Sequence, residues 1–142
     1  MAVAARFPRS HEELLRAIAE QAPDAIVYAD RQGVIRFWNG AAERIFGRAA
    51  ADAVGLSLDI IIPERLRTAH WNGFRSAVGT GRTKYDGQSL TTRAVHSDGR
   101  KLYVELSFSL LRDDRGTVCG VVATARDCTE RYLAEREHQP VR

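Results

Sequence analysis

The sequence predicts an α+β domain: one five-stranded antiparallel sheet, helices on one face of it, and a flanking helix at each end. Three observations lead to this prediction. Two short β-like runs come early in the chain, and three longer ones come late. Several helical stretches lie between these two groups of strands. Strands and helices are therefore grouped along the chain instead of alternating, which is typical of an antiparallel sheet with a helical layer.

The first helix is expected over residues 10–21. Ser10 and Glu13 stand in the positions of a capping box, which marks a helix start. Helical spacing gives this segment one apolar stripe, made of Leu14, Leu15, Ile18 and Ala22. Pro23 ends the helix, because proline cannot continue the hydrogen-bonding pattern.

Two short strands follow, over residues 25–30 and 34–38, and the turn at residues 31–33 joins them into a hairpin. A helical pattern begins at Asn39 and stops at Gly47.

A longer helix is expected to begin at Pro63 and to close at Gly79 and Gly81, after a short helical piece over residues 58–62. Residues at positions i, i+4, i+7 and i+8 share one face of this helix, and they are His70, Phe74, Ala77 and Val78.

Three strands are predicted over residues 85–95, 101–111 and 118–125, with turns at residues 97–99 and 113–116. The middle strand has strictly alternating apolar residues, namely Leu102, Val104, Leu106, Phe108 and Leu110. This alternation predicts one buried face.

The last helix is expected to begin at Asp127, because Glu130 follows it at capping-box spacing. The chain is therefore divided into an N-terminal flanking helix (1–22), a core (23–127) and a C-terminal output or linker helix (128–142).

Composition limits the classes of protein that the chain can belong to. With 142 residues, 44% of them hydrophobic, the chain is expected to bury one core. Apolar runs are far shorter than the roughly 20 residues that a membrane-spanning helix needs, and no secretory signal is recognisable. The net charge is only +3 and the basic residues are scattered, so neither a membrane nor a nucleic-acid partner is expected.

Cys119 and Cys128 are expected to be free thiols. Along one extended strand they would lie about 30 Å apart, which is too far for a disulfide. Free thiols fit a reducing compartment, so we expect a cytoplasmic location.

Four segments, in this order, resemble the PAS family of sensory domains: residues 24–26, 34–47, 97–100 and 126–131. The resemblance extends over about residues 15–132. It implies a five-stranded sheet that cups a ligand pocket under the central helices. It also implies a final segment that links the sheet to an output helix, and a role in signal transduction as a sensor, not an enzyme. No phosphate-binding loop or nucleophile elbow argues otherwise.

Residues 63–106 are similar to the haem-binding PAS domains of rhizobial oxygen-sensor kinases. In those domains a helix led by Pro-Glu carries the iron-ligating histidine seven residues after the proline, and His70 stands at that position. The resemblance implies haem b as cofactor with His70 as the metal ligand. Tyr85, Leu106 and Phe108 match apolar positions on the other side of the haem. Lys84 matches a residue that holds a propionate.

Leu90 stands where those sensors have an arginine that steadies bound oxygen. We therefore expect a diatomic gas as ligand, with CO or NO favoured over O2. Gln88 is the one nearby side chain that we expect to donate a hydrogen bond instead.

The residue types agree with haem chemistry, which needs a neutral imidazole, an apolar slot and cations near two carboxylates. His70, the apolar strand, Phe74 and the pair Arg82 and Lys84 could supply these. Helices of this type look common in PAS domains without haem, so a second hypothesis stays open. It is a haem-free module for protein interaction, dimerisation or binding of a small organic ligand. In both cases we expect a homodimer and a downstream output domain or partner protein.

Overall fold

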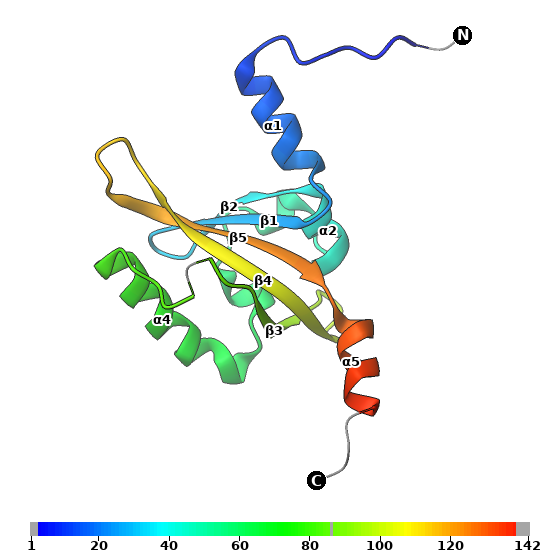
Figure 1. The fold of residues 1–142 in the computed structure, drawn as a ribbon, viewed down its shortest axis with the longest axis vertical. Helices are drawn as coiled ribbons and strands as arrows, with labels where there is room; N and C mark the ends of the chain where they lie inside the picture. Colours follow the sequence, from blue (N-terminus) through cyan, green and yellow to red (C-terminus); the bar gives the residue numbers. More distant parts are fainter. Residues whose placement is uncertain (1–2, 86, 139–142) are drawn as a thin grey trace.

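The computed structural model describes residues 3–85 and 87–138 (Figure 1). Its strands are β1 (Ala25–Asp30), β2 (Ile35–Trp38), β3 (Leu90–Val95), β4 (Lys101–Arg112) and β5 (Val118–Asp127). They form one sheet in the order β2-β1-β5-β4-β3, and every neighbouring pair is antiparallel. The predicted α+β fold is confirmed.

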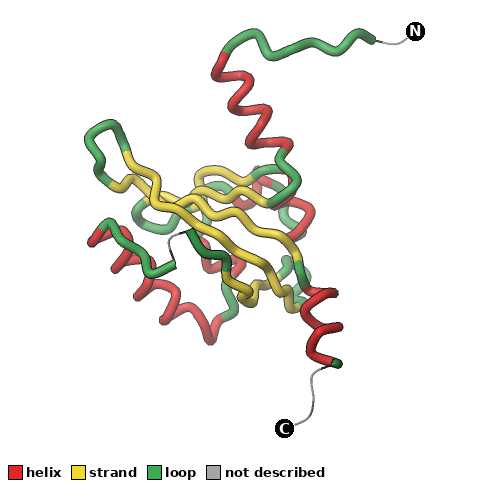
Figure 2. The backbone as a smooth tube through the Cα atoms, viewed as in Figure 1, coloured by secondary structure: helices red, strands yellow, loops and turns green. Residues whose placement is uncertain are grey.

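The helices are α1 (His11–Gln21), α2 (Gly40–Phe46), α3 (Ala50–Ala53), α4 (Arg67–Thr80) and α5 (Thr129–Glu137), with short 3-10 helices η1 (Leu58–Ile61) and η2 (Glu64–Leu66). Figures 1 and 2 show α1 and α5 projecting from opposite ends of the domain, whereas α2 and α4 lie beside the sheet. None of the described helices is long and apolar enough to span a bilayer.

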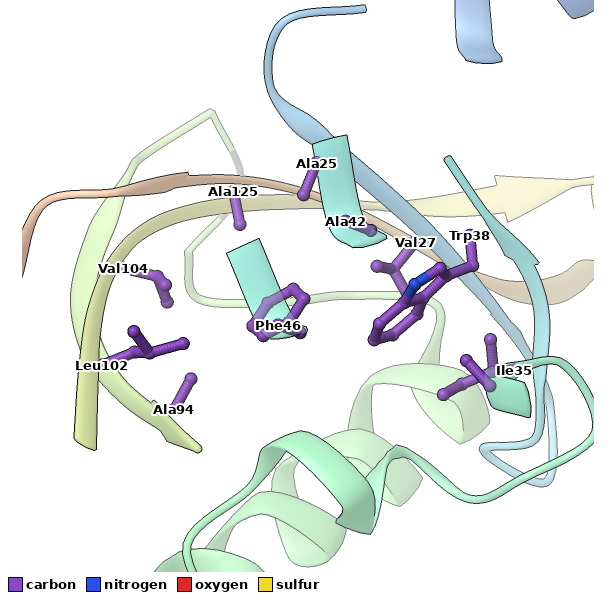
Figure 3. Close-up of a cluster of buried hydrophobic side chains, with 11 residues drawn as sticks. Ala25, Val27, Ile35, Trp38, Ala42, Phe46, Ala94, Leu102, Val104 and Ala125 are labelled. Atoms are coloured by element: carbon purple, nitrogen blue, oxygen red, sulfur yellow. The ribbon is translucent and has the colours of Figure 1, made fainter. Parts of the chain in front are cut away.

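The buried core lies where α2 meets the inner face of the sheet. Figure 3 shows Phe46 between Ala94 and Val104 on one side and Ile35 and Trp38 on the other. The rings of Trp38 and Phe46 are 5.3 Å apart between centroids. The apolar alternation of the sequence therefore faces this core, as predicted.

Asn39 is fully buried and its side chain joins three parts of the chain. Its Oδ1 accepts hydrogen bonds from the backbone N–H of Ile26 (2.9 Å) and of Ala42 (3.0 Å), so Asn39 caps α2. Its Nδ2 donates to the carbonyls of Ala19 (2.9 Å) and Asp24 (3.1 Å). One side chain thus fixes α1, β1 and α2 relative to each other.

The N-terminal helix begins as predicted, since the Ser10 hydroxyl accepts from the backbone N–H of Glu13. In the part of the chain that the structure describes, the apolar stripe of α1 is largely exposed. Leu14, Leu15 and Ile18 are 40%, 53% and 58% exposed. This exposure leaves an apolar surface on α1 that a partner could cover.

The strand predicted over residues 85–95 is shorter than expected, because β3 begins only at Leu90. Gly87 has a positive φ of 71°, and the backbone N–H of Gln88 bonds to the carbonyl of Tyr85 (3.0 Å). This turn precludes an extended strand through Gln88.

The last helix also begins later than predicted, at Thr129, because Asp127 still belongs to β5. The carboxylate of Asp127 accepts hydrogen bonds from the backbone N–H of Thr129 (2.9 Å) and from its hydroxyl (2.6 Å). Cys119 and Cys128 are free thiols, as predicted.

Candidate functional site: a cavity between α4 and the sheet

A cavity of about 600 Å³ lies between α4 and the inner face of the sheet. Cofactor and ligand sites commonly have volumes of about 300–1,000 Å³ and mostly apolar walls. The sheet contributes apolar side chains to this cavity from four of its strands, among them Val27, Leu90, Leu106, Phe108, Val121 and Ala123. The alternation of strand residues explains this wall, because every second side chain of a strand faces the helical layer.

His70 lies on the helical wall of the cavity and is half-buried. Its Nδ1 is buried and has no hydrogen-bond partner among the described residues. Burial lowers the pKa of His70, and the Asp59 carboxylate opposes that shift only in part. The imidazole is therefore neutral near pH 7, which is the form that ligates metals.

The helix that carries His70 is anchored by its apolar face. Phe74, Ala77 and Val78 are buried, as their predicted spacing requires. Phe74 and Val78 pack against Val118 of β5. These contacts orient α4 so that His70 faces the cavity.

Cationic side chains stand at the rim of the cavity, in the segment that follows α4. Arg82 and Lys84 both line the cavity and both are exposed to solvent. The Lys84 Nζ lies 5.1 Å from the centroid of the Tyr85 ring, which in turn packs edge-on against Phe108 at 6.1 Å. The rim can thus attract the carboxylates of a ligand whose apolar part lies inside.

β3 and β4 form part of the sheet wall, which lies opposite α4. Leu90 pairs directly with Leu106 across the two strands. Thr92, two residues after Leu90 on β3, also lines the cavity and carries a hydroxyl. Thr92 was not among the predicted site residues, although a spacing of two residues from Leu90 on one strand puts both side chains on the same face.

The cavity brings together all of the predicted site residues except one. Gln88 is exposed and is absent from the cavity lining. The prediction that Gln88 shares a strand face with Leu90 is wrong, because the turn at Gly87 precedes Gln88 and β3 begins only at Leu90.

Within residues 3–85 and 87–138, no group of three His, Cys, Asp or Glu side chains is arranged to hold a metal ion.

Comparison with known proteins identifies the family to which the chain belongs. Residues 19–133 match the family model described as PAS fold. Sensor protein FixL of Bradyrhizobium diazoefficiens is 39% identical over 62 residues, which cover 44% of this chain and 12% of FixL. Oxygen sensor protein DosP of Escherichia coli is 28% identical over 103 residues, which cover 72% of this chain and 12% of DosP. The chain thus spans only a small part of these relatives.

Solved structures agree on the fold. The PAS domain of a Colwellia psychrerythraea protein superposes with a TM-score of 0.74 at 21% identity, covering 85% of this chain and 99% of that domain. The PAS domain of Bordetella pertussis BvgS gives a TM-score of 0.65 at 19% identity, with coverage of 89% and 92%. At such identities the likeness extends to the fold alone.

Proposed function

This chain belongs to the PAS fold family of sensory domains, and we propose that its cavity binds haem b through His70 and senses a diatomic gas. The observation that supports this proposal best is the buried, unpartnered Nδ1 of His70 on the cavity wall. A buried nitrogen without a partner costs free energy, and a bound group that bonds to this nitrogen would offset that cost. The similarity to FixL and to the oxygen sensor DosP points in the same direction.

The other residues of the cavity fit the parts of a haem. Apolar side chains of β3 and β4 offer contact to a flat porphyrin, among them Leu90, Leu106 and Phe108. Arg82 and Lys84 at the rim would pair with its two carboxylates. Phe74, one turn after His70, fills the space beside the imidazole at a ring distance of 5.9 Å. When bound, haem would supply an iron atom that can take O2, CO or NO.

The wall opposite α4 determines which gas the cavity favours. A polar ligand gains most from a cation or hydrogen-bond donor, and Leu90 is neither. Leu90, Leu106 and Phe108 tolerate a less polar ligand without penalty. We therefore propose that CO or NO is favoured over O2, as inferred from the sequence.

The visible absorption spectrum of the purified protein tests this proposal directly. Haem held by a histidine gives an intense Soret band that co-purifies with the protein or appears when haem is added. If haem added to the protein is washed out by gel filtration without leaving that band, the haem proposal is wrong. A haem-free PAS module for protein interaction, dimerisation or a small organic ligand would then describe the chain.

The biological setting is proposed from the same features. A sensory domain acts through an output domain or partner protein, and α5 is the described element that continues from the sheet toward the C-terminus. Two free cysteines fit a cytoplasmic location.

A further inference from the structure

We propose that the hydroxyl of Thr92 is the hydrogen-bonding contact that the sheet offers to a ligand in the cavity. This inference rests on the proposed role of the cavity as the sensing site. Thr92 would then favour ligands that carry a hydrogen-bond acceptor over ligands that do not. The sequence had suggested Gln88 for this task, but Gln88 is exposed and does not line the cavity.

The orientation of Thr92 follows from the geometry of β3. Leu90, Thr92 and Ala94 alternate along the strand and all three line the cavity. Ala94 is buried, and Figure 3 shows it within the core cluster, near Leu102 and Phe46. Thr91, between the cavity residues, is exposed on the other face. The side chain of Thr92 therefore faces the interior together with those of Leu90 and Ala94.

Thr92 and Arg93 are the two polar residues of the described strands that line this cavity, and the Nε of Arg93 is buried without a hydrogen-bond partner among the described residues. The guanidinium of Arg93 lies over the ring of Tyr103 at 5.9 Å, and these two residues pair on the opposite face of the sheet. The remaining lining side chains of the sheet are apolar: Val27, Ala29, Leu90, Ala94, Val104, Leu106, Phe108, Leu110, Val121, Ala123 and Ala125.

The hydroxyl of Thr92 is free to bond to a ligand. The Ser89 hydroxyl donates to Glu105, and the Thr83 hydroxyl, in the segment after α4, accepts from the N–H of Tyr85. Among the described residues, the Thr92 hydroxyl forms no hydrogen bond of the kind that Ser89 and Thr83 form. An apolar wall with one unengaged hydroxyl is the arrangement by which ligand sites fix orientation and specificity.

The chemistry of a hydroxyl defines the ligands that it selects. A threonine hydroxyl donates one hydrogen bond and has no charge, so its contribution is smaller than that of an arginine. A ligand with a partial negative charge, as O2 would carry if haem held it, would gain this bond. CO is far less polar and gains little. The apolar wall favours CO over O2. Thr92 thus reduces this difference in affinity without reversing it.

The experiment compares three variants of the haem-loaded protein. Thr92→Val keeps the shape of the side chain and removes the hydroxyl, Thr92→Ser keeps the hydroxyl, and Thr91→Val is the control on the exposed face of the same strand. Thr92→Val is expected to weaken O2 binding about twofold to tenfold and to change CO affinity less than that. It should also shift the infrared stretching frequency of bound CO, which a purely structural role would not move. Thr92→Ser and Thr91→Val should retain the wild-type values.

An unchanged ratio of O2 to CO affinity in Thr92→Val, together with an unchanged CO stretching frequency, would overturn the inference. If the protein takes up no haem, the proposed function fails, and the ligand-free protein still tests Thr92. The hydroxyl has no partner in the described chain, so Thr92→Val should leave the melting temperature equal to that of the wild type or raise it. A lower melting temperature, with Thr91→Val unchanged, would mean that the protein itself uses the hydroxyl, and the inference would be wrong.

Discussion

The indole Nε1 of Trp71 donates a hydrogen bond of 2.7 Å to the Oδ1 of Asp59 and thereby ties α4 to η1. The same indole meets the imidazole of His70 edge-on, with 4.7 Å between the ring centroids. Trp71 also lies so close to Gly33 that a Cβ at that position would collide with its ring. The first turns of α4 are therefore held in place from two sides, and His70 with them.

We predict that Asp59→Ala destabilises the domain by about 1–3 kcal/mol, because it leaves the indole N–H of Trp71 without its acceptor. For this hydrogen bond, Trp71→Phe should cost less stability than Asp59→Ala, because it removes the donor and leaves no buried N–H without an acceptor. Urea denaturation of both single variants and of the double variant measures the coupling. Strictly additive losses would mean that the hydrogen bond contributes nothing to stability.

We predict that His70→Ala abolishes retention of haem, because His70 is the one histidine that lines the cavity in the described chain. His96→Ala is the control, since His96 lies at the turn before Gly99 and contacts Asp98 instead. Absorbance after gel filtration measures retained haem. Full retention by His70→Ala would remove this residue from the role of metal ligand.

We predict that Leu90→Arg strengthens O2 binding by about one to two decades, because a hydrogen bond from a charged donor contributes about 1.5–3 kcal/mol. Leu90 lines the cavity directly opposite Leu106 on β4, so an arginine there can reach a bound ligand. Gln88→Ala should have little effect, because the side chain is exposed. The O2 dissociation constants of the variants and the wild type measure this effect. Equal values for Leu90→Arg and the wild type would contradict the prediction.

We predict that α1 and α5 contribute to homodimerisation, with the apolar stripe of α1 as the main contact. Leu15→Glu combined with Ile18→Glu should shift sedimentation from dimer to monomer, because both side chains are more than half exposed. Deletion of residues 1–22 should do the same. The deletion also removes the Ala19 carbonyl that accepts from Asn39, so the double variant is the cleaner test. A dimer that survives both changes would place the interface elsewhere.

We predict that Asp30 stabilises the domain above about pH 4 and that this contribution disappears in acid. Partial burial alone would raise the pKa of Asp30. The hydrogen bonds from the backbone N–H of Val34 and from Arg36 outweigh it and hold this pKa below its ordinary value. A carboxyl with a lowered folded pKa stabilises the fold above its unfolded pKa, and the gain is lost as pH falls through the folded pKa.

Asp30→Asn should therefore cost about 1 kcal/mol near pH 7 and less near pH 3. Urea denaturation at the two pH values measures the difference. Asp114→Asn is a suitable control, because Asp114 is exposed in the turn between β4 and β5. An equal loss at both pH values would show that the charge of Asp30 is not the cause.

The sequence by itself determined the features that near neighbours decide. Ser10 caps α1 and Gly47 ends α2 because the groups that they satisfy lie within four residues of them. The alternation in β4 assigned Leu106 and Phe108 to the inner face, since strand geometry sends every second side chain to the same side. The spacing in α4 likewise put His70 and Phe74 on one face.

Tertiary structure decided what depends on contacts between distant segments. Asp127 stays in β5 because it pairs with Val104, and the next backbone N–H, of Cys128, bonds to the carbonyl of Tyr103. No local signal near Asp127 reveals that pairing. The turn at Gly87 similarly removed Gln88 from β3 and left Thr92 as a polar residue on the inner face. Which residues of β3 face the cavity depends on where β3 begins to pair with β4. That pairing therefore decides which side chain can donate a hydrogen bond to a ligand.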